Sequence, residues 1–248
     1  MRSRPGCADG RAGIGPDPRV ARLAANLNAV RERIAAAALA AGRRPGEVTL
    51  IAVTKTFPVD DVRRLAALGV GDFGENRDQE ASVKASLVPA VRWHFVGRLQ
   101  RNKARGVAGY VDVVHSVDRP ELVDALDTAS ARVRSRPLDV LAQIDLDPQP
   151  DPRRGGIRPA EVAGLTDRIA AATHLRLAGV MAVAPLGGDP DQAFGRLAVV
   201  SARIRADRPD AAMVSAGMSG DLEAAIRHGA THVRVGTALL GGRENLVR

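Results

Sequence analysis

The fold of this chain is constrained most by eight short apolar runs that recur along the sequence with helical stretches between them. Several of these runs are apolar throughout instead of alternating with polar residues, which is typical of strands covered on both faces. The eight runs are therefore predicted to be strands. They cover residues 48–54, 70–76, 92–97, 111–117, 138–146, 175–183, 211–217 and 231–237.

Seven predicted helices separate the strands, and an additional helix over residues 19–41 precedes them. The additional helix carries apolar residues at helical spacing, and Gly42 followed by Pro45 supplies its end. Eight strands with seven intervening helices predict a (β/α)8 barrel, with an open doubly wound sheet as the alternative. The longest loop, residues 148–156, follows the fifth strand. The intervening helices are predicted over residues 58–69, 78–87, 100–109, 119–133, 158–172, 190–206 and 219–229.

The length of 248 residues suits one barrel, so residues 19–248 are predicted to form a single domain. Residues 1–18 contain arginines but no apolar segment of a signal peptide, and they are predicted to be a disordered tail. The single cysteine, Cys7, lies in this tail, which excludes an intramolecular disulfide and favours a cytoplasmic location. No segment approaches the roughly 18 apolar residues of a membrane helix. We therefore expect no binding to membranes. The chain is also expected to be a monomer.

The formal net charge of +8 raises the question of nucleic-acid binding. The arginines are scattered through predicted helices, and aromatic residues, on which bases would stack, make up only 2% of the chain. Solvated helix faces explain this charge better, so no nucleic-acid partner is expected.

Lys55 is unusual because only three of the 36 basic residues are lysines, Lys55, Lys84 and Lys103. It follows the apolar run at residues 48–53, at the end of the first predicted strand, where the active sites of such barrels lie. In phase with Ile51 and Val53, it is expected to point inward, where a desolvated lysine can act as a nucleophilic amine for Schiff-base chemistry. Alternatively, Lys55 extends to solvent or pairs with Glu75 or Asp145.

A second group of residues lies near the end of the chain. The segment SAGMSGDLEAA, residues 215–225, ends the seventh strand and opens a helix, with Ser219 as its expected N-cap. The eighth strand ends at Gly236 and Thr237. Loops after strands seven and eight commonly bind phosphate in these barrels. A phosphate site beside an inward-facing lysine describes a site for pyridoxal 5'-phosphate.

Three further polar residues are candidates for the same site. Arg234 shares the strand phase of Gly236, so its buried guanidinium needs a partner, either the pyridine nitrogen of the cofactor or an acidic residue such as Glu75. Asn76 and His94 end neighbouring strands and are expected to hydrogen-bond the ring hydroxyl or to line the pocket, although His94 could equally be a structural histidine. The spacing of the histidines predicts no metal site.

Five segments resemble, in order and spacing, the pyridoxal phosphate homeostasis proteins of the YggS/PROSC-like family. They are AVTKTFP, FGENRDQE, WHFVGRLQRNKAR, HSVDR and SAGMSGDLEAAIRHGATHVRVGTALLGGRE, and the resemblance covers residues 19–244. It implies a fold type III barrel similar to the N-terminal domain of alanine racemase.

The resemblance also implies roles for individual residues. Lys55 would form the Schiff base, Arg234 would face the pyridine nitrogen and Asn76 would lie near the ring. The phosphate would be held by Ser215, Gly236 and Thr237. Arg77 and Ala216 depart from the family pattern, which often has Tyr and Met at these places.

A carrier of the cofactor, which would serve apo-enzymes that depend on it, is expected in preference to an amino-acid racemase. A racemase needs two acid/base groups on opposite faces of the cofactor. In the alanine racemase pattern the second group is a tyrosine from an additional β domain, for which the eleven residues after Thr237 leave no room. The only tyrosine, Tyr110, precedes the fourth predicted strand. An arginine at the ring nitrogen would also weaken the ring as an electron sink.

Overall fold

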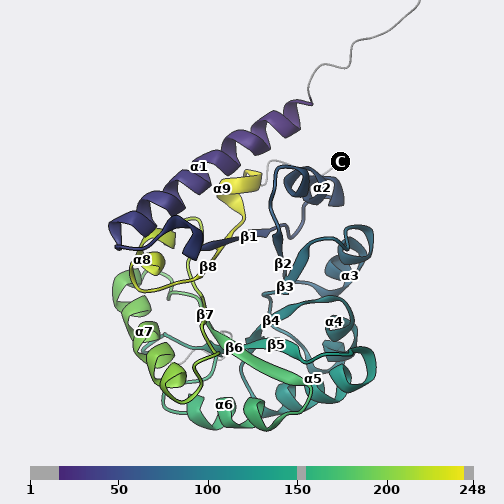
Figure 1. Cartoon of the computed structure of the whole chain (residues 1–248), viewed down its shortest axis with the longest axis vertical. Coiled ribbons are helices and arrows are strands. Elements are labelled where there is room, and N and C mark those ends of the chain that lie inside the picture. Colours follow the sequence, from purple (N-terminus) through teal and green to yellow (C-terminus); the bar gives the residue numbers. More distant parts are fainter. Residues whose placement is uncertain (1–16, 150–154, 243–248) are drawn as a thin grey trace, which may run out of the picture.

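Eight parallel strands close into a barrel in sequence order in the computed structural model, which describes residues 17–149 and 155–242 (Figure 1). Strand β8 pairs with β1, with Ala52 opposite Val235, so the sheet has no free edge. The closed sheet confirms the (β/α)8 barrel and rules out the open doubly wound alternative. The strands are β1 (Thr49–Val53), β2 (Asp72–Glu75), β3 (Arg92–Phe95), β4 (Val113–Val117), β5 (Leu138–Ile144), β6 (Leu175–Ala182), β7 (Met213–Ser215) and β8 (His232–Val235).

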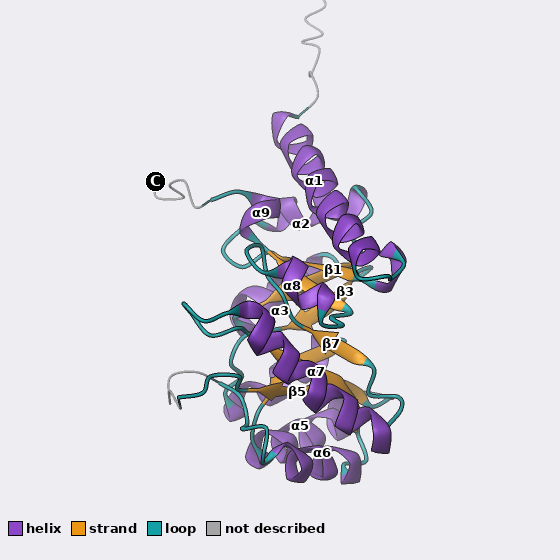
Figure 2. Ribbon diagram, turned by 90° about the vertical axis from the view of Figure 1, so that its left-hand side faces the viewer, coloured by secondary structure: helices purple, strands orange, loops and turns teal. Residues whose placement is uncertain are grey.

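Helices surround the barrel on its outer side and alternate with the strands, as the sequence pattern predicts (Figures 1 and 2). Two short 3-10 turns, η1 (Pro45–Glu47) and η2 (Arg101–Lys103), precede β1 and α4. The helices are α1 (Pro18–Ala40), α2 (Val59–Ala67), α3 (Asp78–Leu87), α4 (Ala104–Tyr110), α5 (Pro120–Val133), α6 (Val162–Ala171), α7 (Pro190–Asp207), α8 (Leu222–Arg227) and α9 (Thr237–Leu240).

Helix α1 lies across the outside of the barrel beside α8 and α9 (Figure 1). It begins where Asp17 accepts a hydrogen bond from the N–H of Arg19 at 2.8 Å, with Pro18 in the first turn. Its apolar stripe is buried against the barrel, and Asn26 donates to the carbonyl of Leu239 in α9 at 2.9 Å. The buried residues of the stripe are Leu23, Leu27, Val30, Ile34 and Ala38.

The interior of the barrel has an apolar part and a polar part. Val113, Leu141, Ala178 and Met181 form an apolar cluster there. In the polar part, His115 of β4 is hydrogen-bonded to Ser215 of β7. Because β4 and β7 are not neighbouring strands, this bond crosses the barrel interior. The buried polar residues of this part are His94, His115, Ser215 and Arg234.

Parts of two predicted segments lie outside the described residues, namely residues 1–16 of the tail and residues 150–154 of the loop after β5. The same holds for residues 243–248. Among the helices that the structure does describe, none combines the length and apolar character needed to cross a bilayer.

Candidate functional site

Four neighbouring strands bring most of the predicted site residues to the carboxyl end of the barrel. Around the wall the order is β7, β8, β1 and β2. Ser215 ends β7, Gly236 follows β8, Lys55 lies two residues beyond β1, and Asn76 follows β2. Residues that are up to 181 positions apart in sequence therefore meet at one end of adjacent strands, where sites of (β/α)8 barrels lie.

Lys55 is more exposed than its strand phase predicted. Strand β1 ends at Val53, so the inward phase does not continue to Lys55, whose side chain is exposed. The chain turns immediately afterwards, because Thr56 adopts φ = 70°. Burial does not desolvate the amine of Lys55, contrary to expectation, and the turn brings it to the mouth of the barrel.

Of the three lysines, only Lys55 lacks a polar partner among the described residues. Lys84 is buried and donates to Glu75 and Glu80 at 2.7 Å and 2.6 Å. Lys103 lies 3.6 Å from a carboxylate oxygen of Asp78. The alternative in which Lys55 pairs with Glu75 does not occur, since Lys84 takes that place.

The other expected partner of Lys55, Asp145, is also engaged elsewhere. Its carboxylate accepts from the guanidinium of Arg158 at 3.0 Å and from the N–H of Asp147 at 3.0 Å. Among the described residues, Lys55 is thus the lysine whose amine is free to react with a ligand.

Gly236 and Thr237 form a tight connection between β8 and α9. A Cβ atom at Gly236 would lie 3.2 Å from the carbonyl oxygen of Val53, so a larger residue would press on the end of β1. Within residues 17–149 and 155–242, no protein acceptor binds the N–H of Gly236 or of Thr237. These two N–H groups are therefore free to bind an anion.

Ser219 does not cap α8 as expected. Asp221 occupies the N-cap position, and its carboxylate accepts from the N–H of Met218 at 2.6 Å. The hydroxyl of Ser219 instead accepts from the N–H of Ala238 at 3.3 Å. Ser219 therefore joins the loop after β7 to the N–H groups after β8. The sequence pattern predicts only a local cap at this serine, so a contact with the loop after β8 did not follow from it.

Asn76 has an unsatisfied buried atom. Its Oδ1 is buried and has no hydrogen-bond partner among the described residues, which is costly for a polar atom. Its backbone is held by close packing against Gly97, where a Cβ atom would lie 2.3 Å from the carbonyl oxygen of Asn76. An unsatisfied atom in a fixed position is typical of a ligand-binding group.

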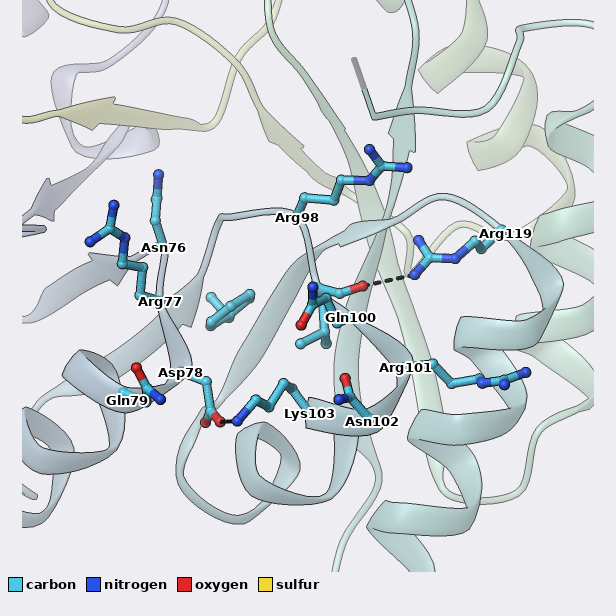
Figure 3. Close-up of a pocket in the computed structure, with 12 residues that line it drawn as sticks. Asn76, Arg77, Asp78, Gln79, Arg98, Gln100, Arg101, Asn102, Lys103 and Arg119 are labelled. Carbon is cyan, nitrogen blue, oxygen red and sulfur yellow. Dashed lines mark hydrogen bonds and ion pairs between the residues drawn. The ribbon is translucent and has the colours of Figure 1, made fainter. Parts of the chain in front are cut away.

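A basic cavity of about 920 Å³ is lined in part by Asn76 (Figure 3). One wall carries Arg119, which donates to the carbonyl of Leu99 at 2.8 Å. The cavity lies beside the predicted site and does not include Arg234 or Gly236. Its other cationic lining residues are Arg77, Arg98, Arg101 and Lys103.

Arg234 is buried beneath the site, and its partners are neutral. It donates to the hydroxyl of Ser215 at 2.7 Å and to the carbonyl of Ala182 at 2.9 Å. Burial lowers the pKa of Arg234 to about 10, so the guanidinium remains charged at neutral pH. The alternative in which Arg234 forms an ion pair with Glu75 does not occur, and the site beneath the mouth keeps an unneutralised positive charge.

A chain of hydrogen bonds crosses the barrel from Arg234 to Asp72. Ser215 Oγ lies 2.9 Å from Nδ1 of His115, whose Nε2 lies 2.8 Å from Nδ1 of His94. Nε2 of His94 lies 2.9 Å from the carboxylate of Asp72 at the start of β2. Arg234 can only donate and an ionised carboxylate can only accept, so the direction of every bond is set from both ends.

The direction of this chain determines the protonation of both imidazoles. With neutral rings, His115 and His94 each carry the proton on Nε2, and the Ser215 hydroxyl donates to His115. Burial lowers the pKa of His94 and lowers that of His115 still further, which keeps both rings neutral at pH 7. His115 was not among the predicted site residues, although its inward position in β4 could have indicated a role.

His94 does not reach the mouth of the barrel, where it was predicted to contact the cofactor or line its pocket. Both of its ring nitrogens are occupied, by His115 and Asp72, within the barrel interior. Neither nitrogen is available for a ring hydroxyl at the mouth. The physical reason is that His94 lies inside β3, one residue before its end, so its side chain points into the barrel below the mouth.

Tyr110 lies between α3 and α4. It is the last residue of α4, and its hydroxyl donates to Oδ1 of Asp78 in α3 at 3.2 Å. Burial and the nearby Asp78 raise its pKa, so the hydroxyl stays protonated. The hydroxyl of Tyr110 is therefore held by Asp78, two residues after Asn76.

The barrel that carries Lys55 matches a known protein family. The family described as "Alanine racemase, N-terminal domain" matches residues 21–244. An alanine racemase of Corynebacterium glutamicum has the same fold, with a TM-score of 0.70 at 17% identity, covering 92% of this chain and 64% of that one.

Nearer relatives define the group within this class. A pyridoxal phosphate homeostasis protein of Mycobacterium tuberculosis is 46% identical over 92% of this chain and 95% of its own length. The Escherichia coli K12 protein of the same name is 38% identical over 90% of this chain and 97% of its own. PipY of Synechococcus elongatus, whose structure was solved with PLP bound, has a TM-score of 0.77 and 32% identity over 88% of this chain and 100% of that one. The chain belongs to the family of the pyridoxal phosphate homeostasis proteins.

Proposed function

We propose that this protein binds pyridoxal 5'-phosphate and acts in its homeostasis, as a carrier or regulator without robust catalysis of its own. The observation that carries the proposal is Lys55, a lysine without a polar partner among the described residues, at the mouth of the barrel between Asn76 and Gly236. When bound, the cofactor supplies an aldehyde that reacts with amines. The relatives of this protein, PipY and the pyridoxal phosphate homeostasis proteins, support the assignment of this cofactor.

The chemistry of the site fits this cofactor. The phosphate is a dianion, and the free N–H groups of Gly236 and Thr237 are donors suited to it. The hydroxyl of Ser219 lies beside them, since it accepts a hydrogen bond from the N–H of Ala238. The amide of Asn76, with its unsatisfied Oδ1, suits a polar group of the ring. The lysine, the anion donors and the amide are the three kinds of group that such a ligand requires.

Two residues are proposed to act from below the cofactor. Arg234 would donate to the pyridine nitrogen, and a guanidinium that stays charged would keep that nitrogen unprotonated. Ser215 was assigned to the phosphate, and its hydroxyl already joins Arg234 to His115. We propose that Ser215 orients Arg234 and approaches the phosphate from that position. His94 would act only through His115 and Ser215.

The same residues argue against a racemase as the main activity. An unprotonated pyridine nitrogen is a poor electron sink for a carbanion. A second acid/base group opposite Lys55 is also needed, and Tyr110 is bound to Asp78 between α3 and α4. The racemases of this fold share less than a fifth of their residues with this chain, so they inform the fold alone.

One experiment separates the carrier from the racemase. Purified protein is mixed with pyridoxal 5'-phosphate, its absorbance spectrum is recorded, and L-alanine is added while D-alanine is measured with a chiral assay. We expect a spectral change upon binding and no D-alanine above the level produced by the free cofactor. Formation of D-alanine at enzymatic rates, on the order of 1 per second or faster, would contradict the carrier function.

A further inference from the structure

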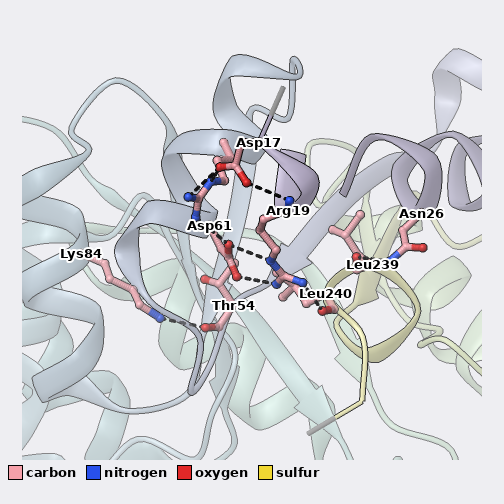
Figure 4. Close-up of polar contacts among 9 residues, drawn as sticks. Asp17, Arg19, Asn26, Thr54, Asp61, Lys84, Leu239 and Leu240 are labelled. Carbon is pink, nitrogen blue, oxygen red and sulfur yellow. Dashed lines mark hydrogen bonds and ion pairs between the residues drawn. The ribbon is translucent and has the colours of Figure 1, made fainter. Parts of the chain in front are cut away.

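The two peptide groups that flank Lys55 are both hydrogen-bonded to charged side chains of α3. The carbonyl of Thr54 accepts from Lys84 Nζ at 2.8 Å (Figure 4). The N–H of Thr56 donates to Oε1 of Glu80 at 2.6 Å. Lys84 and Glu80 are also paired with each other at 2.6 Å. Together Lys84 and Glu80 form what we call the α3 clamp, which grips the turn on both sides of Lys55.

Lys84 gives the clamp its rigidity. Its residue surface is only 4% exposed, and its three N–H donors go to Thr54 O, Glu75 and Glu80. A buried ammonium group is tolerated only when its donors are satisfied, so this geometry is strongly fixed. Glu75 reinforces it, because its carboxylate also accepts from the hydroxyl of Thr54 at 2.7 Å.

Thr56 shows that the turn is held under backbone strain. With φ = 70° it is the single non-glycine residue in the left-handed region within the described part of the chain. A β-branched residue disfavours this conformation, which persists only where surrounding contacts enforce it. The hydrogen bond from Thr56 N–H to Glu80 is such a contact, and it lies one residue after Lys55.

We propose that Glu80 and Lys84 are positioning residues that hold the Lys55 turn in the geometry needed for attachment of the cofactor. The proposal rests on the function proposed above. Attachment condenses the neutral amine of Lys55 with the aldehyde and releases one water, whose oxygen comes from the aldehyde and whose two protons come from the amine. An exposed lysine without a polar partner among the described residues depends on its backbone for direction, and the clamp fixes that backbone.

Three substitutions of Glu80 test this role. Glu80→Ala removes the acceptor for Thr56, Glu80→Asp keeps the charge but shortens the reach, and Glu80→Gln keeps an acceptor oxygen at full reach. The measured quantity is the rate at which pyridoxal 5'-phosphate attaches to Lys55, trapped with borohydride and located by mass spectrometry. We expect Glu80→Ala and Glu80→Asp to slow attachment by about tenfold or more, and Glu80→Gln to stay within about threefold of the unmodified protein.

Two controls separate positioning from general damage. Glu121→Ala removes an exposed acid from the first turn of α5 and should leave the rate unchanged. Pyridoxine 5'-phosphate carries an alcohol in place of the aldehyde, so its calorimetric affinity reports the non-covalent site alone. We expect that affinity and the melting temperature of Glu80→Asp to match those of the unmodified protein.

Each outcome decides between the proposals. Folded Glu80→Ala and Glu80→Asp variants that attach the cofactor at the unmodified rate would overturn the positioning role. Equal losses of pyridoxine 5'-phosphate affinity and attachment rate would also overturn it, since they indicate damage to the whole site. If the unmodified protein binds pyridoxine 5'-phosphate but never attaches pyridoxal 5'-phosphate at Lys55, the function proposed for Lys55 fails instead.

Discussion

The imidazole rings of His94 and His115 are hydrogen-bonded to each other inside the barrel, with His115 Nε2 2.8 Å from His94 Nδ1. Their rings lie edge to face, with centroids 5.0 Å apart. His94 donates to Asp72 at the start of β2, and His115 accepts from the hydroxyl of Ser215 at the end of β7. The buried guanidinium of Arg234, beneath the mouth, is therefore connected by hydrogen bonds to a carboxylate at the start of β2.

The buried histidines predict that stability depends on pH. Burial holds the pKa of His115 well below its usual value. Burial, together with the nearby His94, lowers the pKa of His232 to about 4. Below about pH 6.5 the unfolded chain takes up protons that the folded barrel does not, so the free energy of unfolding must fall as pH drops. Each histidine contributes up to about 1.4 kcal/mol per pH unit in this window.

Urea unfolding at about pH 7.5 and about pH 5 measures this dependence. The His115→Gln variant should show a smaller loss between the two conditions than the unmodified protein, because it removes one of the histidines that must remain neutral. An unfolding free energy that is independent of pH over this range would contradict the neutral hydrogen-bonded chain.

Replacement of Arg234 should change what the bound cofactor can do. Arg234→Glu places a carboxylate where a protonated ring nitrogen could be stabilised, which would strengthen the ring as an electron sink. We expect weaker cofactor binding and measurable exchange of the α-proton of L-alanine in heavy water. Arg234→Gln is the matched control, since it removes the guanidinium without adding a negative charge, and it should show no exchange. Equal exchange in both variants would remove the role assigned to the ring nitrogen.

The phosphate should supply most of the affinity for the cofactor. Hydrogen bonds to a charged group contribute roughly 1.5–3 kcal/mol each, and at least two N–H donors, those of Gly236 and Thr237, are available. Pyridoxal without the phosphate should therefore bind at least about a hundredfold more weakly. Titration calorimetry with both compounds measures the ratio. Similar dissociation constants would show that the anion site at Gly236 and Thr237 does not exist.

Arg19 connects α1 to the parts of the barrel next to the site. It donates twice to the buried carboxylate of Asp61 in α2, at 3.0 Å and 2.5 Å, and to the carbonyl of Leu240 in α9 at 3.1 Å (Figure 4). Arg19→Met should lower the free energy of unfolding by about 1–3 kcal/mol, because Asp61 keeps only the longer contact to Arg64. Arg22→Met, on the exposed side of α1, is the control. A change no larger than that of the control would show that α1 is held by its apolar stripe alone.

The fold followed from the sequence because its signals are local and repeated. Each apolar run became a strand, and each helical segment between them became a helix, since covered parallel strands and crossover helices have distinct periodicities. Closure into a barrel was favoured by the number of strands alone. The pairing of β8 with β1 is a long-range property that no local pattern contains.

The site was predictable where residues end strands, and less so where side chains cross the interior. Lys55, Asn76 and Gly236 lie at the mouth as expected, because strand ends of a closed barrel gather there. His94 was assigned to the mouth from its position near the end of β3, but its partners are His115 and Asp72. Contacts between strands that are not neighbours depend on how the barrel closes, which the sequence pattern does not specify.

The α3 clamp could not be anticipated for a similar reason. Lys84 and Glu80 read as an ordinary i, i+4 pair on a helix surface. Their roles arise because α3 packs where the turn after β1 exposes its peptide groups, and the turn itself depends on the left-handed conformation of Thr56. A non-glycine residue in that conformation carries no sequence signal.

The most direct test of the account is to find which lysine carries the cofactor. The protein is incubated with pyridoxal 5'-phosphate, reduced with borohydride, digested and analysed by mass spectrometry, with Lys55→Ala as the comparison. We expect one modified peptide, containing Lys55, and no modification of the folded Lys55→Ala variant, because Lys84 and Lys103 are paired with carboxylates. Modification of Lys84 or Lys103 at equal yield in the variant would contradict it.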